Sequence, residues 1–192
     1  MSTPINIIID VSGSMNEMGK IHLQRNLCCY AAQLKTMDHD KYADIDVRFY
    51  QWAQSVSKII VQNEGDIPPL VTEGSSSMRA LSDFLSKSLN DMESLRVLIL
   101  SDGNFDRDEF KSFLEYKEKI KRLLIRTVAV GTDSDLLKLK EISSNDSVYL
   151  SENIAAAIDC SIFGSDEPVT APESTAQILQ TKPSGPEEDW DA

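Results

Sequence analysis

Residues 7–19, "IIIDVSGSMNEMG", decide the fold prediction, because an apolar strand ends here in a cluster of polar side chains. Three isoleucines precede Asp10, and Ser12 and Ser14 follow it at alternate positions. Side chains two residues apart in an extended segment point the same way, so one carboxylate and two hydroxyls can meet at one point. Oxygen ligands of this kind suit Mg²⁺ or Mn²⁺. The segment therefore predicts a buried strand that delivers half of a metal site.

Short apolar strands and helical patterns alternate along the rest of the chain. Strands are expected at residues 5–11, 45–53, 55–61, 96–102, 125–131 and 148–151, with the second and third forming a hairpin. Helices are expected at residues 23–37, 78–92, 108–123, 133–144 and 152–163. This order predicts a Rossmann-like, doubly wound α/β fold. Its six-stranded sheet is mostly parallel, with one antiparallel edge strand and helices on both faces.

Two aspartates are expected at the same edge of this sheet. The most apolar strands, which end at Asp10 and Asp102, are expected to be central, and ligands of such sheets bind beyond the carboxyl ends of the strands. If the two strands are neighbours, their carboxylates meet at this edge. Two unpaired carboxylates that lie close together repel each other, and a bound cation removes the repulsion. Two carboxylates leave a divalent ion about neutral, which favours a third carboxylate supplied by a partner.

The motifs resemble those of von Willebrand factor A (vWA) domains with a metal-ion-dependent adhesion site. "DVSGSM" is similar to the D-x-S-x-S signature of that family, and "LILSDG" to the strand that ends in its later aspartate, here Asp102. "GSSSMRAL" resembles the family's threonine segment and has Ser75, after Gly74, at the threonine position, with Ser76 and Ser77 as alternatives. The resemblance covers roughly residues 4–163, including the later "TVAVG" strand and the helix that follows it.

The resemblance implies a protein-interaction module that is not an enzyme. Asp10, Ser12 and Ser14 would bind Mg²⁺ (or Mn²⁺) directly, and Ser75 and Asp102 would bind it directly or through water. The open position of the ion would accept a Glu or Asp from a partner protein. Stand-alone bacterial vWA proteins, including the tellurium-resistance type, are similar in build. They imply an adaptor or regulatory subunit of a cytoplasmic stress-response assembly, beside an ATPase, kinase or phosphatase.

Other interpretations of the same residues remain open. "DVSGSM" is also compatible with a plain strand-to-helix turn whose serines cap a helix. A Mg²⁺-dependent phosphatase of the haloacid-dehalogenase type is the alternative function, since such enzymes also place an aspartate after the first strand. Their second aspartate, the general acid, is replaced here by Ser12, and phosphoryl transfer then lacks its proton donor.

Composition separates a folded domain, residues 1–164, from an acidic tail, residues 165–192. The tail has four prolines and carries about half of the net charge of −12, so it is expected to be disordered, with "PEEDW" as a possible docking motif. Another hypothesis is that the acidic side chains of the tail occupy the metal site of a neighbouring copy of the chain.

The same composition bounds partners and location. The acidic balance argues against nucleic acid and anionic membranes as partners. Neither a membrane span nor a signal peptide is expected, because no apolar run is long enough and the first strand starts near residue 5; this points to the cytoplasm. The three cysteines are expected to form no disulfide bond and to act as small apolar side chains.

Overall fold

A six-stranded sheet forms the centre of the protein in a computed structural model, which describes residues 3–61, 65–90 and 92–164. The order of the strands is β3-β2-β1-β4-β5-β6, and only β3 runs antiparallel to its neighbour. The strands are β1 (Thr3–Asp10), β2 (Ile45–Trp52), β3 (Val56–Lys58), β4 (Leu95–Ser101), β5 (Leu123–Ala129) and β6 (Val148–Leu150). The predicted fold class is confirmed, whereas the predicted acidic tail lies outside the described residues.

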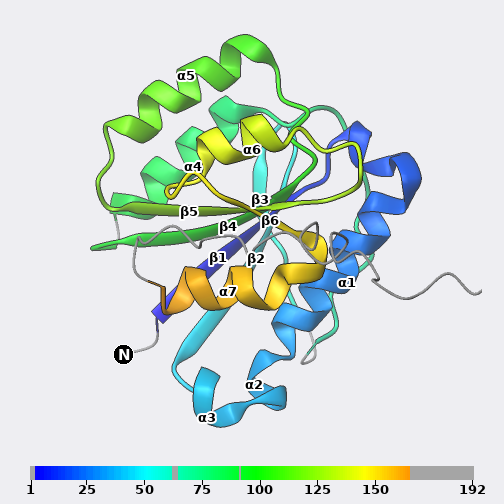
Figure 1. The fold of residues 1–192 in the computed structure, drawn as a ribbon, viewed down its shortest axis with the longest axis vertical. Helices are drawn as coiled ribbons and strands as arrows, with labels where there is room; N and C mark the ends of the chain where they lie inside the picture. The colour runs from blue at the N-terminus through cyan, green and yellow to red at the C-terminus, as the bar shows by residue number, and fades with distance from the viewer. Residues whose placement is uncertain (1–2, 62–64, 91, 165–192) are drawn as a thin grey trace, which may run out of the picture.

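Helices cover both faces of this sheet (Figure 1). On one face lie α4 (Met78–Asn90), α5 (Arg107–Glu118) and α6 (Leu136–Ile142), and on the other lie α1 (Lys20–Ala32) and α7 (Ile154–Ile162). The remaining elements are η1 (Gly13–Gly19), α2 (Leu34–Met37), α3 (His39–Tyr42) and η2 (Ser151–Asn153). Among the described residues, no helix is both long and apolar enough to cross a membrane.

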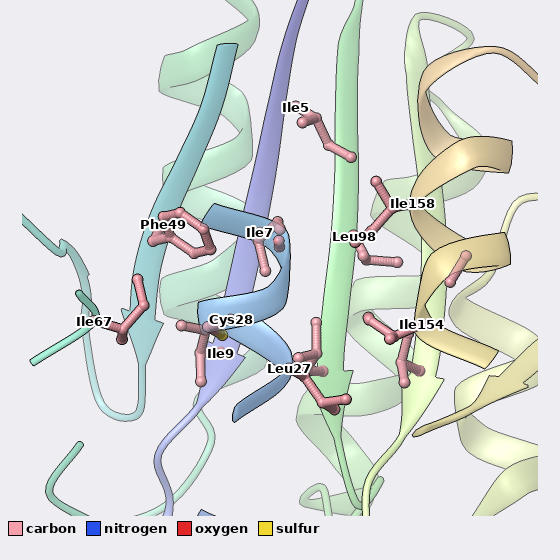
Figure 2. Close-up of a cluster of buried hydrophobic side chains, with 14 of the residues drawn as sticks. Ile5, Ile7, Ile9, Leu27, Cys28, Phe49, Ile67, Leu98, Ile154 and Ile158 are labelled. Atoms are coloured by element: carbon pink, nitrogen blue, oxygen red, sulfur yellow. The ribbon is translucent and has the colours of Figure 1, made fainter. Parts of the chain in front are cut away.

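Each face of the sheet buries its own apolar core, because successive side chains of a strand point to opposite sides. Ile5, Ile7 and Ile9 of β1 pack with residues of α1 and α7, as Figure 2 shows. Ile8 points the other way and joins Trp52 and the apolar faces of α4, α5 and α6. Trp52 is fully buried.

The two central strands bring the predicted site to one edge. β1 and β4 are adjacent and parallel, and their register pairs Ile9 with Leu100. Asp10 therefore lies opposite Ser101, one residue before Asp102. The prediction that these two apolar strands are central is confirmed, and because they are also neighbours both aspartates lie close together at the carboxyl edge of the sheet.

The first helix differs from its prediction in phase and length. The helical spacing of Leu23, Leu27, Tyr30, Leu34 and Met37 predicts that they form one face of the helix. Leu23 and Met37, however, are 36% and 58% exposed. The buried face is instead formed by Lys20, Ile21, Gln24, Leu27, Cys28 and Ala31. The helix also ends at Ala32, with a turn at Gln33 before α2. Lys20 and Gln24 are polar residues on the inner face of α1. Because the prediction expected only apolar residues there, it assigned the wrong residues to the buried face.

Candidate metal centre

Asp10 is a buried carboxylate held by hydrogen bonds alone. Its side chain is 0% exposed. Oδ1 accepts hydrogen bonds from the backbone N–H of Ser12 at 2.9 Å and from Oγ of Ser76 at 2.8 Å, and Oδ2 accepts one from Oγ of Ser101 at 2.6 Å. Burial raises the pKa of Asp10, and the hydrogen bond from Ser101, followed by those from Ser12 and Ser76, offsets part of that rise. Within the described part of the chain, Asp10 forms no ion pair.

Ser12 and Ser14 lie next to each other on the turn that follows β1. Their hydroxyl oxygens are 3.2 Å apart. Ser12 is 3% exposed, whereas Ser14 is half-buried and lines a cavity of about 190 Å³. The backbone N–H of Gly13, between them, donates to the carbonyl oxygen of Gly74 at 2.9 Å. This hydrogen bond fixes the turn against residues 74–77. Asp10, Ser12 and Ser14 therefore lie together at the carboxyl edge of the sheet, as predicted.

Residues 74–77, the serine segment, present Ser76 to Asp10, and Ser76 is one of the two alternatives to Ser75 as the predicted ligand. Ser76 is buried and is the residue that donates to Asp10. Ser75 is exposed, and in the described ranges it makes no hydrogen bond to Asp10. Ser77 turns toward α5, where its hydroxyl donates to Oε2 of Glu109 at 3.0 Å and accepts from the N–H of Ala80. Of these three adjacent serines, Ser76 is the one whose hydroxyl reaches Asp10.

Asp102 carries a cationic partner that the sequence did not reveal. Nζ of Lys20 lies 2.8 Å from Oδ2 of Asp102 and 2.9 Å from Oδ2 of Asp133. Oδ1 of Asp102 accepts a hydrogen bond from the N–H of Asn104 at 3.0 Å. Burial by itself would lower the pKa of Lys20, but the hydrogen bonds to Asp102 and Asp133 outweigh it and raise the pKa. Lys20 therefore remains an ammonium ion beside the candidate centre.

The donor set suits a hard divalent cation only if hydroxyl oxygens take part. No group of three or more His, Cys, Asp or Glu side chains that can hold a metal ion occurs among the residues that the structure describes. The hydroxyls that contact Asp10 are those of Ser12, Ser76 and Ser101, and the hydroxyl of Ser14 lies 3.2 Å from that of Ser12. Oxygen donors with one or two carboxylates match the preference of Mg²⁺, which also retains waters. Asp10, buried without an ionic partner in the described part of the chain, is the residue that such an ion would neutralise.

Solved structures with the same arrangement of strands and helices identify the fold. The vWF domain of the pilus tip protein Mfa5 from Porphyromonas gingivalis matches with a TM-score of 0.58 at 9% identity, over 82% of this chain and 93% of that chain. This is the von Willebrand factor A fold. Manganese-loaded TRAP from Plasmodium vivax matches with a TM-score of 0.64 at 17% identity, over 84% of this chain and 73% of that one.

Other vWA-type structures are longer than this chain. The ArnB paralog VWA2 from Sulfolobus acidocaldarius matches at 17% identity with a TM-score of 0.58, over 81% of this chain. The chain spans less than half the length of several of the solved proteins that it matches, 44% in the case of VWA2. No protein-family model and no curated protein matches the sequence. The similarity is therefore one of fold.

Three residues at the carboxyl edge of the sheet were not predicted from the sequence, namely Lys20, Ser101 and Asp133. Lys20 had no clear signal, because the sequence predicted a different buried face for α1 and the acidic partners of the lysine are distant in the sequence. Ser101 follows an apolar strand directly and precedes Asp102, which also marks the edge. Asp133 carries no such signal, because it lies in an ordinary polar turn between β5 and α6.

Proposed function

We propose that the chain is a protein-interaction module that works through a divalent metal ion. Asp10, Ser12, Ser14 and Ser76 would hold Mg²⁺ or Mn²⁺, with Asp102 alongside, and an acidic side chain of a partner protein would complete the coordination. Ser76 takes the place that the sequence gave to Ser75. When bound, the ion supplies a positive centre that attracts a carboxylate.

The observation that carries this proposal is the state of Asp10. A fully buried carboxylate that relies on hydroxyl and N–H donors retains its charge at a cost, and a divalent ion at the hydroxyls removes that cost. The manganese-loaded TRAP structure, which has the same fold, supports the assignment. Ser14 is half-buried and borders a cavity, so a ligand can approach the site from that side.

An interaction role fits these side chains better than phosphoryl transfer. A phosphatase of the haloacid-dehalogenase type needs a carboxylic acid two residues after its first aspartate, and Ser12 at that place has only a hydroxyl. We therefore assign no catalytic residue.

The wider setting belongs to the same proposal. We place the module in the cytoplasm of a bacterium, as an adaptor or regulatory subunit beside an ATPase, kinase or phosphatase of a stress-response system such as that for tellurium resistance. The acidic balance of the sequence agrees with a protein partner in place of nucleic acid or membrane.

Capture of partners under controlled metal concentrations tests the proposed function. The full chain is immobilised and incubated with cell extract in Mg²⁺ or in chelator, and the proteins retained are quantified by mass spectrometry. Proteins retained by the wild type in Mg²⁺ should be lost in chelator and lost with Asp10→Asn, once circular dichroism has shown that this variant is folded. Ser75→Ala is the matched control and should retain them. Retention that ignores both the chelator and Asp10→Asn contradicts the proposal.

A further inference from the structure

Lys20 joins three segments at the carboxyl edge of the sheet. It is the first residue of α1, it pairs with Asp102 just after β4, and it pairs with Asp133 in the turn between β5 and α6. The lysine is 2% exposed, so its ammonium group is withdrawn from water together with Asp102, which is 3% exposed. A lysine buried in this way is stable only when acidic partners face it.

The chain leaves a defined space for this lysine. Gly131, which follows β5, has a φ of +99°, and a Cβ atom added there would lie 2.6 Å from Cδ and 3.0 Å from Cγ of Lys20. The methylene stem of Lys20 therefore passes so close to Gly131 that a side chain at this position would displace it. The turn between β5 and α6 therefore fixes the ammonium group, through the space at Gly131 and the ion pair with Asp133.

The lysine meets the candidate metal centre through Asp102. Both oxygens of this carboxylate already have donors, Nζ of Lys20 on Oδ2 and the N–H of Asn104 on Oδ1. Asp10, by contrast, has no ionic partner within the described ranges. A divalent ion at Asp10 and the adjacent serines would therefore find one carboxylate free of cations and the other already neutralised by a cation of the protein itself.

We propose that Lys20 is a built-in counter-cation of the candidate centre, which competes with the divalent ion for Asp102 and keeps this edge folded when no ion is bound. The inference rests on the proposed metal site. Like charges repel, so the ammonium group weakens binding of the ion, and Asp133 limits that effect by drawing the ammonium toward the β5–α6 turn. The centre would then exchange its ion readily and remain folded without it.

Replacement of the ammonium group tests this competition. Lys20→Met retains the stem and removes the charge. Lys138→Met is the matched control, because Lys138 lines the same cavity but its Nζ donates to the carbonyl oxygen of Phe105 and lies 3.6 Å from Asp135. For each full-length protein, the affinity for Mn²⁺ is measured by calorimetry and the melting temperature is measured in chelator and in Mn²⁺.

The competition predicts opposite effects on stability and on affinity. In chelator, Lys20→Met should melt several degrees below the wild type, and Mn²⁺ should raise its melting temperature more than that of the wild type. Its affinity for Mn²⁺ should be at least tenfold higher, whereas Lys138→Met should stay within about threefold of the wild type. Equal affinities in Lys20→Met and the wild type, or an equal gain in Lys138→Met, would overturn the counter-cation.

The outcomes separate this inference from the proposed function. If Mn²⁺ binds Lys20→Met but not the wild type, the counter-cation stands and the metal-dependent function of the wild type fails. If Mn²⁺ binds the wild type and binds Lys20→Met no more tightly, the metal site stands and the counter-cation is wrong. If neither protein binds Mn²⁺, both are wrong.

A second pair of variants keeps the test valid if Lys20→Met does not fold. Asp133→Asn removes the second partner of Lys20 and leaves the ammonium group to Asp102 alone, which should lower the affinity for Mn²⁺ at least threefold relative to Asp135→Asn. Asp135→Asn removes an equal charge from the same cavity, and asparagine still caps α6. Equal affinities of these two variants would contradict the role of Lys20.

Discussion

Oγ of Ser76 donates a hydrogen bond of 2.8 Å to Oδ1 of Asp10, which joins the segment before α4 to the end of β1. Ser75, its neighbour in the sequence, points to solvent. The backbone bond from the N–H of Gly13 to the carbonyl oxygen of Gly74 fixes the two loops in this register. Which serine serves the site is therefore decided by the register of the loop.

Alanine substitutions at the two serines should have different effects. Ser76→Ala removes a buried donor from a carboxylate and should lower the free energy of unfolding by about 1–3 kcal/mol. It should also reduce the rise in melting temperature that Mg²⁺ produces. Ser75→Ala should change the free energy of unfolding by less than about 0.5 kcal/mol, as expected for an exposed side chain. It should leave the rise in melting temperature with Mg²⁺ nearly unchanged. Thermal denaturation with and without Mg²⁺ measures both effects. A larger effect of Ser75→Ala would show that the other serine is the ligand.

The position of the site was predictable because strand order follows from apolar content. The runs ending at Asp10 and Asp102 are the most apolar, and burial on both faces forces such strands to the centre of a parallel sheet. The choice among three adjacent serines was not predictable, since each has a hydroxyl and only the loop conformation distinguishes them. Lys20 was missed for a related reason, because a lysine on an inner helix face is recognisable only when its acidic partners, distant in sequence, are known.

The fit between Lys20 and Gly131 predicts a cost for adding one methyl group. Gly131→Ala combines an unfavourable positive φ with a contact of 2.6 Å to the Lys20 stem. Gly19→Ala has a similar positive φ of +74°, but no atom lies within 4 Å of the added carbon. The backbone strain alone costs about 1–2 kcal/mol, so Gly131→Ala should be destabilised by that amount and by about 1–3 kcal/mol more. Urea denaturation of the two variants compares them, and equal losses would contradict a close fit at Lys20.

The thiol of Cys28 should be inert while the protein is folded. Cys28 is fully buried, and burial raises its pKa well above the usual range, so the reactive thiolate is scarce even at pH 9. Cys29 and Cys160 are half-buried and should react first with iodoacetamide. Peptide mapping by mass spectrometry after timed labelling ranks the three sites. In urea the ranking should disappear, whereas fast labelling of Cys28 in the native protein would contradict the burial of its side chain.

Phosphatase activity is the outcome that distinguishes the alternative function. With Mg²⁺ and an alkyl phosphate such as glycerol phosphate, hydrolysis by the wild type should equal that of Asp10→Asn, because an alkoxide leaving group needs a general acid and the hydroxyl of Ser12 supplies none. The release of inorganic phosphate, measured by a colorimetric assay, gives the rate. Turnover that needs Mg²⁺ and disappears with Asp10→Asn would favour the haloacid-dehalogenase mechanism.

Direct binding of Mn²⁺ tests whether the carboxyl edge of the sheet holds a divalent metal ion. Electron paramagnetic resonance follows the free ion as the full-length protein is titrated, without any need for a known partner. We expect the signal of free Mn²⁺ to fall with the binding of one ion per chain, and Mg²⁺ to restore it by competition. Asp10→Asn and Ser14→Ala should bind at least tenfold more weakly than the wild type. An unchanged free-ion signal with folded wild-type protein, or equal binding by Asp10→Asn, would contradict a metal centre at this edge of the sheet.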